Sequence, residues 1–196
     1  QGQSMQGLVR VPSNDPVAIK KSMDIGADGV IVPMILSQEE AKKAVEAVRY
    51  PPLGNRGVGL SRALHYGTGF SSYNEWVNNQ SVVIVQIEHI DAVNNLESIL
   101  KVDGVDGIIV GPYDLSASLG KPGKFDDAEI KDALNRIEEV SSRYDKSLGY
   151  HVINPSHSDV MLKINQDYNF IAFSLDFLFL GDKVRGEMHK LKQKIK

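Results

Sequence analysis

Two stretches of this sequence decide the fold: VVIVQIE (Val82–Glu88) and DGIIVGPYD (Asp106–Asp114). In each, a short run of mostly β-branched apolar residues gives way to a segment that carries a carboxylate. Such runs are typical of strands buried on both faces, which a parallel sheet requires. Parallel α/β folds place their chemistry at the C-terminal ends of the strands, where Glu88 and Asp114 fall. Two such carboxylates can share a hard divalent cation, because it prefers oxygen ligands. The first hypothesis is therefore a metal-dependent α/β enzyme.

The composition is that of an ordinary globular protein. The 196 residues suffice for one substantial core but are few for two, so we predict a single domain over 1–196. Apolar residues make up 42% and the net charge is −3, with no basic excess that would indicate nucleic-acid binding. No apolar run is long enough for a membrane span, and no signal peptide is visible. The absence of cysteine excludes a disulfide framework, a thiolate metal site and a cysteine nucleophile. We predict a cytoplasmic protein.

Predicted strands and helices alternate along the whole chain. The periodicity of apolar residues predicts six strands, at 7–11, 29–33, 82–88, 107–110, 148–152 and 170–174. Helices are predicted after them, at about 16–25, 38–48, 70–78, 91–100, 126–144 and 157–164, with a last amphipathic helix that ends at residue 196. Asp15 before Pro16 indicates the start of the first helix, and Ser37 with Glu40 three residues later is a capping-box pattern at the start of the second. The irregular stretch 49–68 is long enough to predict a functional loop or a linker. Six β-then-α units indicate a parallel sheet with helices outside it.

The number of units leaves two architectures open. No Gly-x-Gly-x-x-Gly follows the first strand and no Walker A pattern is present, which disfavours a nucleotide-binding open sheet. A (β/α)₈ barrel typically has about 250 residues, and six units fall two short of eight. The sequence therefore predicts either an open sheet or a barrel whose first quarter is missing from this sequence.

Several motifs occur in one order and spacing that resemble a known family. They include VRVPSNDP (9–16), RYPPLGNRGV (49–58), VQIE (85–88) and GVDGIIVGPYDLS (104–116). The whole chain resembles the HpcH/HpaI family of class II aldolases, which act on 2-keto-3-deoxy and 4-hydroxy-2-keto acids. The resemblance implies a (β/α)₈ TIM barrel of the phosphoenolpyruvate/pyruvate type. It also implies that roughly two further βα units, with a general-base histidine in a Glu-His pair, precede the point where this sequence begins.

The resemblance gives roles to the residues of the two deciding stretches. Glu88 and Asp114 would be the ligands of a divalent metal cation, Mg²⁺, Mn²⁺ or Co²⁺, that holds the pyruvyl part of the substrate. The alternative is that both carboxylates only cap the helices that follow. Gln86 lies two residues before Glu88, so both side chains project from the same face of the strand. Gln86 would bind the keto-acid oxygens; otherwise it is a core glutamine with satisfied hydrogen bonds.

Two further residues would act in catalysis. Arg10, near the end of its strand, would bind the keto oxygen and stabilise the enolate; taken in isolation, it would rather form a structural ion pair. Asp24 would raise the basicity of the catalytic histidine across a subunit boundary, although from the sequence alone it is an undistinguished residue near a helix C-terminus. None of the five histidines lies at the family's base position, and we assign none of them to catalysis.

The segment Gly111-Pro112-Tyr113 is predicted to be a substrate-binding loop beside Asp114. Free N–H groups of Gly111 and Tyr113 would hold the substrate carboxylate, whereas Pro112 has no N–H to give. Family members often have a small residue in place of Tyr113. The larger side chain would narrow the pocket or hydrogen-bond a longer substrate.

The function predicted on this basis is that of a carbon–carbon lyase. It would cleave a 4-hydroxy-2-keto acid, of the 2-keto-3-deoxy sugar acid or dihydroxyheptenedioate type, reversibly to pyruvate and an aldehyde. The resemblance also implies a homohexamer built as a trimer of dimers, with small molecules as the other partners. Two alternatives stay open: another pyruvate- or phosphoenolpyruvate-type C–C lyase or acyl-CoA lyase of the same superfamily, and a keto-acid-binding relative without activity.

Overall fold

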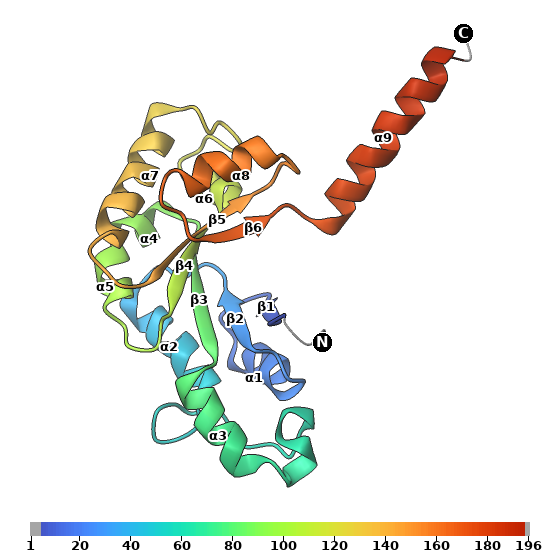
Figure 1. Ribbon diagram of the computed structural model, residues 1–196. Helices are drawn as coiled ribbons and strands as arrows, with labels where there is room; N and C mark the ends of the chain where they lie inside the picture. The colour runs from blue at the N-terminus through green and yellow to red at the C-terminus, as the bar shows by residue number, and fades with distance from the viewer. Residues whose placement is uncertain (1–4, 195–196) are drawn as a thin grey trace.

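The computed structural model describes residues 5–194 and contains one curled, fully parallel sheet (Figure 1). Each strand pairs with its neighbour in sequence, in the order β1 (Leu8–Arg10), β2 (Gly29–Val32), β3 (Val82–Ile87), β4 (Gly107–Val110), β5 (Ser147–Val152) and β6 (Phe170–Phe173). The predicted parallel sheet is confirmed, and its sequential order is the one a barrel requires. Over the described residues β1 and β6 are the two edges of a half-barrel, so the closed eight-unit barrel stays a prediction.

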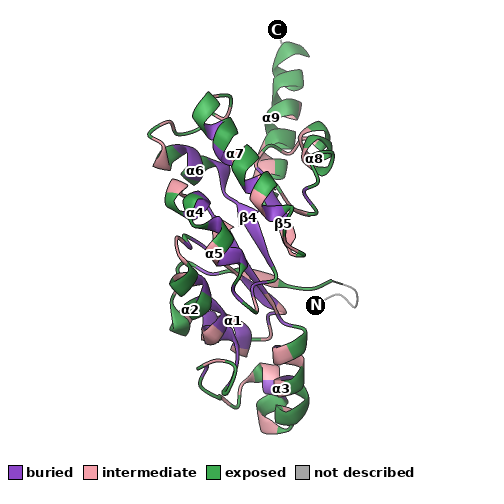
Figure 2. Cartoon of the chain, turned by 90° about the vertical axis from the view of Figure 1, so that its left-hand side faces the viewer, coloured by how far each residue is buried: buried purple, intermediate pink, exposed green. Residues whose placement is uncertain are grey.

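Helices follow the strands and cover the convex face of the sheet. The helical elements are α1 (Pro16–Asp24), α2 (Gln38–Val48), η1 (Arg62–Gly67), α3 (Phe70–Asn79), α4 (Ile90–Asn94), α5 (Leu96–Leu100), α6 (Pro112–Ser118), α7 (Ala128–Ser141), α8 (His157–Ile164) and α9 (Asp176–Lys194). Figure 2 shows the buried strands β4 and β5 behind α4, α5 and α7. No helix within residues 5–194 is long and apolar enough to cross a membrane. The cytoplasmic location stays a prediction.

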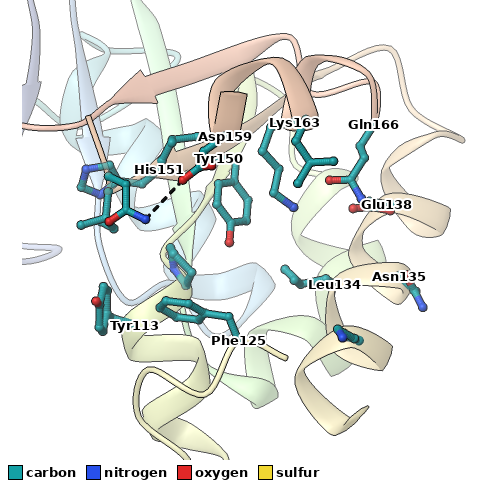
Figure 3. Close-up of a pocket in the computed structure, with 16 residues that line it drawn as sticks. Tyr113, Phe125, Leu134, Asn135, Glu138, Tyr150, His151, Asp159, Lys163 and Gln166 are labelled. Carbon is teal, nitrogen blue, oxygen red and sulfur yellow. Dashed lines mark hydrogen bonds between the residues drawn. The ribbon is translucent and has the colours of Figure 1, made fainter. Parts of the chain in front are cut away.

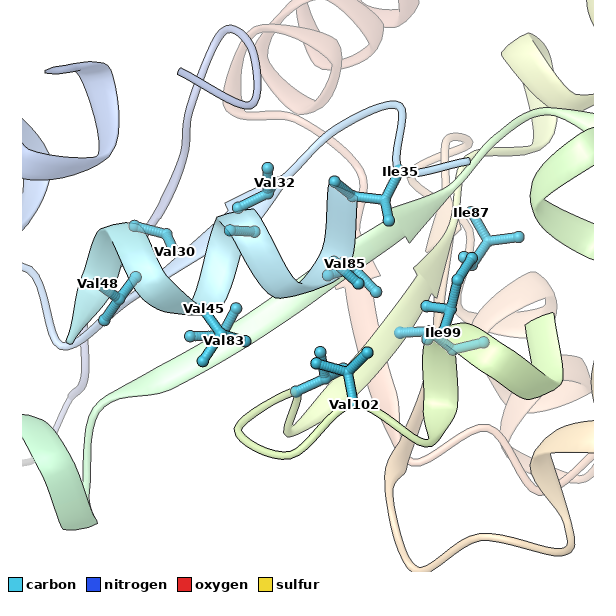
Figure 4. Close-up of a cluster of buried hydrophobic side chains, with 14 of the residues drawn as sticks. Val30, Val32, Ile35, Val45, Val48, Val83, Val85, Ile87, Ile99 and Val102 are labelled. Carbon is cyan, nitrogen blue, oxygen red and sulfur yellow. The ribbon is translucent and has the colours of Figure 1, made fainter. Parts of the chain in front are cut away.

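The core lies between the sheet and these helices. Every second residue of the central strands points outward, and Val83, Val85 and Ile87 of β3 are fully buried there. They belong to one cluster with Val45 of α2 and Ile99 of α5 (Figure 4). The alternate residues of the same strands point to the concave face. This face is therefore available for a binding or catalytic site.

Local capping explains where the first helices begin. The Asp15 carboxylate accepts hydrogen bonds from two N–H groups of α1, as its position before Pro16 predicts. The Ser37 hydroxyl accepts from the Glu40 N–H at 3.2 Å, which confirms half of the predicted capping box. The Glu40 carboxylate takes the N–H of Leu36 at 2.6 Å, one residue earlier than the ideal box.

Two sequence predictions of local structure were wrong. The helix predicted over 91–100 is broken at Asn95, whose backbone (φ −98°, ψ 6°) ends α4 and begins α5 while its side chain donates to the Leu36 carbonyl at 2.8 Å. The loop predicted at Gly111-Pro112-Tyr113 is instead the start of α6, because Pro112 occupies the first helical position, which its fixed φ favours. The stretch 49–68 contains the short helix η1.

One buried cation ties this long stretch to two helices. The Arg56 side chain is fully buried; its Nη2 lies 2.6 Å from Asp24 Oδ1 at the end of α1, and its Nη1 lies 3.1 Å from the Tyr73 hydroxyl of α3. The guanidinium carbon also stands 4.8 Å from the ring centroid of Tyr50 and 5.4 Å from that of Tyr73. Such cation–π contacts strengthen when water is excluded, so Arg56 fixes the path of the chain here.

We therefore expect Arg56→Met to lower the free energy of unfolding by about 3 kcal/mol, because it leaves the largely buried Asp24 carboxylate with the more exposed Lys20 as its remaining ion-pair partner. The matched control is Arg143→Met, which removes an exposed ion pair with Glu139 and should cost less than about 0.5 kcal/mol. Urea unfolding followed by circular dichroism measures both. Equal effects would show that the buried network does not stabilise this part of the fold.

Candidate active site

All predicted site residues except Asp24 gather at the C-terminal edge of the sheet, on its concave face. Glu88 follows β3 directly, and Arg10 is the last residue of β1. Ile87 pairs with Val110, which brings Glu88 beside Gly111 on the next strand. This is the edge where parallel α/β folds carry their chemistry.

Glu88 is buried in an arrangement that leaves one oxygen unused. The side chain is only 1% exposed, and its Oε1 accepts a hydrogen bond from the Met34 N–H at 2.8 Å. Its Oε2 is buried and has no hydrogen-bond partner among residues 5–194. Burial raises the pKa of the Glu88 carboxyl, the Met34 N–H opposes the rise, and the charge of Asp114 adds to it. A buried oxygen of this kind is costly unless a cation or a proton satisfies it.

Asp114 and Gly111 complete the surroundings of that oxygen. Asp114 lies in the first turn of α6, close enough to Glu88 for its charge to raise the pKa of the Glu88 carboxyl. A Cβ atom at Gly111 would stand 2.8 Å from Glu88 Oε2 and 2.8 Å from Gln86 Nε2, so only glycine leaves this space open. The structure thus brings together the two carboxylates that the sequence predicted to bind a metal.

These residues fit a hard divalent cation. The donors are carboxylate oxygens, and within residues 5–194 no group of three metal-ligating side chains surrounds them. Mg²⁺ is commonly bound by one or two protein carboxylates and completes its shell with water and substrate oxygens, a pattern that Mn²⁺ tolerates as well. The unpartnered Glu88 Oε2 is the observation that such an ion would explain.

A cavity of about 540 Å³ opens beside this centre. Its walls come from all six strands and from segments that follow three of them, and they are formed by Arg10, Ile31, Gln86, Ile109, Gly111, Pro112, Tyr113, Asp114, His151, Ile153, Ala172, Ser174 and Leu175. Arg10 Nε donates to Gln86 Oε1 at 3.3 Å, which couples the two residues predicted to bind the keto acid. Arg10 forms no ion pair with any residue from 5 to 194, so the structural ion pair considered as its alternative is not found there.

Tyr113 forms a wall of the cavity, as the sequence analysis considered. It is half exposed, and its ring packs edge-on against Phe125 with centroids 4.9 Å apart. The predicted anion-binding loop needs a correction, because the N–H of Gly111 is not free. It donates to the Ile87 carbonyl at 3.1 Å, which extends the sheet by one residue.

Asp24 lies away from this cavity. Asp24 is the last residue of α1. Because α1 runs antiparallel to the strands, its C-terminus lies near the N-terminal ends of the strands, away from the cavity. Its carboxylate binds Arg56 at 2.6 Å and Lys20 at 2.5 Å. Within one chain Asp24 does not join the other site residues, and a role across a subunit boundary stays a prediction.

His151 is a cavity residue that the sequence analysis did not select. It lies in β5, and its side chain points to the concave face while its neighbour Tyr150 points outward (Figure 3). Strand alternation alone puts His151 on the same face as Gly149, but the sequence did not say which face of β5 was concave. Only the pairing of β5 with β4 settles that point.

A parallel half-barrel with paired carboxylates and an arginine at its C-terminal edge has the arrangement of an α/β barrel enzyme. The family model of HpcH/HpaI aldolase/citrate lyase matches residues 1–172. The chain therefore belongs to the HpcH/HpaI aldolase/citrate lyase family, as predicted.

Individual relatives agree with this assignment. The 5-keto-4-deoxy-D-glucarate aldolase of Escherichia coli O139:H28 is 37% identical over 177 residues, which cover 90% of this chain and 68% of the relative. Among solved structures, an HpcH/HpaI aldolase/citrate lyase family protein from Burkholderia cenocepacia J2315 superposes with a TM-score of 0.88 at 30% identity, covering 94% of this chain and 73% of its own. The citrate synthase SbnG does so with a TM-score of 0.81 at 27% identity, covering 95% and 72%.

The state of Glu88 leads to a prediction about stability. Because its pKa is raised, ionised Glu88 destabilises the folded protein at every pH above the ordinary carboxyl range, and this penalty disappears as the pH falls below that range. Glu88→Gln removes the charge. In the presence of a chelator at pH 7.5, we expect the variant to melt about 2–4 °C above the parent protein, as a gain of roughly 1 kcal/mol would produce.

With saturating Mn²⁺ the parent protein should instead melt at the higher temperature, because only the protein with an intact Glu88 gains stability from binding the ion. Differential scanning fluorimetry measures both conditions. The control is Glu97→Gln, an exposed change on α5 that should shift neither melting temperature by more than about 1 °C. A variant that gains as much from Mn²⁺ as the parent would contradict the assignment of Glu88 as a ligand.

Proposed function

We propose that this protein is a divalent-metal-dependent class II aldolase that cleaves a 4-hydroxy-2-keto acid to pyruvate and an aldehyde. The observation that carries the proposal is the buried, unpartnered Glu88 Oε2 beside Asp114, at the edge of a cavity that also holds the Arg10–Gln86 pair. The name of the Escherichia coli relative supports a sugar-derived keto acid as the substrate class.

The described residues divide the work of binding and charge stabilisation. Glu88 and Asp114 would hold the cation, which supplies Lewis-acid polarisation of the substrate ketone when it is bound. Gln86 orients the keto-acid end through its amide, while its oxygen holds the Arg10 side chain in place at 3.3 Å. In this proposal the Arg10 guanidinium contacts the C2 oxygen, where negative charge develops, and would stabilise that charge more than the neutral ketone.

The proposed cleavage is balanced in atoms and electrons. A base removes the proton of the C4 hydroxyl, the C4–O bond becomes a carbonyl, and the C3–C4 bond breaks. Its electron pair moves to C3 and C2 and gives the enolate of pyruvate, which is then protonated at C3. The resemblance assigns the base to a histidine outside the printed sequence, so none of the described residues carries that step in this proposal.

A second candidate is a related carbon–carbon bond-forming reaction with the same enolate. The similarity to the citrate synthase SbnG favours it, because the name of that protein denotes an enzyme that forms a carbon–carbon bond. A keto-acid-binding protein without turnover is the remaining alternative. Proton exchange at C3 of pyruvate separates a working enolate site from a binding protein, and aldehyde release separates cleavage from condensation with another acceptor.

The test of Arg10 uses these two measurements. In Mn²⁺, we expect wild-type protein to exchange the C3 protons of pyruvate into deuterated water and to cleave 4-hydroxy-2-keto acids. Arg10→Gln should lower kcat/KM for cleavage by roughly 10²–10³-fold, the size of effect seen when one donor to a developing oxyanion is removed. Arg143→Gln, an exposed change on the helical side, should leave both activities unaltered.

Nuclear magnetic resonance of the pyruvate methyl group follows exchange, and lactate dehydrogenase coupling follows cleavage. Absence of exchange in the wild-type protein with Mn²⁺ would overturn the proposed enolate chemistry. Exchange without cleavage of any 4-hydroxy-2-keto acid would favour the condensing enzyme instead.

We also propose that the protein assembles into a homo-oligomer, a hexamer by the family resemblance. Helix α9 extends away from the rest of the chain (Figure 1). It carries a stripe of large apolar residues spaced three or four apart, each about half to two-thirds exposed: Phe177, Leu180, Val184, Met188 and Leu191. A stripe of this kind on a helix is normally buried against a partner.

Leu180→Glu should therefore lower the mass of the assembly, because it places a charge in the stripe. Light scattering after size-exclusion chromatography measures the mass, which for the parent protein should be a multiple of the mass of one chain. The control is Lys183→Glu, on the same helix but with a polar, 76% exposed side chain. A parent protein that is monomeric, or a variant that assembles normally, would contradict the proposal.

A further inference from the structure

One row of inward-facing residues crosses the central strands at the level of Glu88. Ile87 pairs with Val110, Val110 with Tyr150, and His151 with Ala172. The next positions along the first three strands, Glu88, Gly111 and His151, therefore stand side by side and share the concave face. With strands about 4.8 Å apart, the Cα atoms of Glu88 and His151 are separated by roughly 10 Å.

The residues between and beyond these two leave the space open. Gly111 contributes no side chain, and Ala172 on the far side contributes only a methyl group. The His151 imidazole consequently lines the same 540 Å³ cavity as Arg10, Gln86 and Asp114, from the opposite wall. A substrate held by its keto-acid end at Arg10 and Gln86 extends across this space toward His151.

The hydrogen bonding of His151 restricts what it can recognise. Burial lowers the pKa of its imidazole, and a hydrogen bond with the Ser174 backbone partly opposes this effect by favouring the protonated ring. The ring is therefore neutral at pH 7.5 and carries a single N–H donor. Its second nitrogen is then a bare acceptor, which suits a hydroxyl group and disfavours a carboxylate. A lowered pKa also makes His151 a weak proton acceptor for catalysis.

The cavity continues past this residue. His151, Tyr113, Pro112 and Ile153 also line a second cavity, of about 510 Å³, between β5, α7 and α8 (Figure 3). His151 thus stands where the two spaces meet, at the end of the first cavity that is farther from Arg10. This position is suited to contact with the aldehyde-derived half of a substrate.

We propose that His151 is a specificity-determining residue that accepts a hydrogen bond from a hydroxyl group on the aldehyde half of the substrate. The inference rests on the proposed aldolase function and adds the class of aldehyde, a hydroxyaldehyde. His151 takes no part in forming the enolate, so reactions of pyruvate alone do not depend on it.

The test compares two aldehydes of equal length in condensation with pyruvate, using the full chain with Mn²⁺. Glycolaldehyde carries the hydroxyl group, and propionaldehyde carries a methyl group in its place. Wild-type protein should prefer glycolaldehyde in kcat/KM. His151→Leu should lower that preference about tenfold, as expected for one lost hydrogen bond, and His151→Gln, which keeps an acceptor oxygen, should retain most of it.

Exchange of the pyruvate C3 protons serves as the control, and it should be the same in wild type and in both variants. If exchange is normal but the preference for glycolaldehyde is unchanged in His151→Leu, the inference is overturned while the proposed function stands. If both variants lose exchange, His151 acts in the enolate step or in the fold and the inference is wrong. If the wild-type protein itself shows no exchange, the proposed function fails first.

Discussion

The in-register parallel pairing of β3, β4 and β5 is the constraint on which the rest of the structure depends. It directs Val83, Val85 and Ile87 to the helices and the alternate residues Gln86 and Glu88 to the concave face. A shift of one residue in this register would exchange the two sets and bury the polar ones in the apolar core. The apolar packing of the convex face therefore determines the arrangement of the polar site on the other face.

The charges of Glu88 and Asp114 repel each other at the site, and packing elsewhere in the fold compensates for the lost stability. Glu88 is buried beside Asp114, with one oxygen held by the Met34 N–H and the other unpartnered. Two carboxylates so close together destabilise the metal-free protein, which is a common property of sites built to bind a cation. The buried packing of β3 and its neighbours offsets this cost. In a different part of the chain, the buried Arg56 neutralises the charge of Asp24 and fixes the path of the stretch 49–68.

Much of the fold followed from local patterns. The β-branched runs that end in Glu88 and Asp114 predicted buried parallel strands, and Asp15 and Ser37 predicted helix starts that the structure confirms. The break at Asn95 could not be read from its neighbours, because its side chain is fixed by a carbonyl distant in sequence, that of Leu36. The loop-like sequence around Gly111 predicted that its N–H would bind a substrate. In the structure this N–H instead donates to the Ile87 carbonyl of the neighbouring strand.

The sequence by itself determined which residues could carry chemistry and on which strands they lie, because strand alternation and apolar runs are local properties. It also indicated the family through several motifs in a fixed order. The tertiary structure alone decided that the oxygen of Glu88 has no partner, that Asp24 lies at the far edge with Arg56, and that His151 shares a row with Glu88. Each of these facts depends on pairing and packing between segments distant in the sequence, which no local pattern encodes.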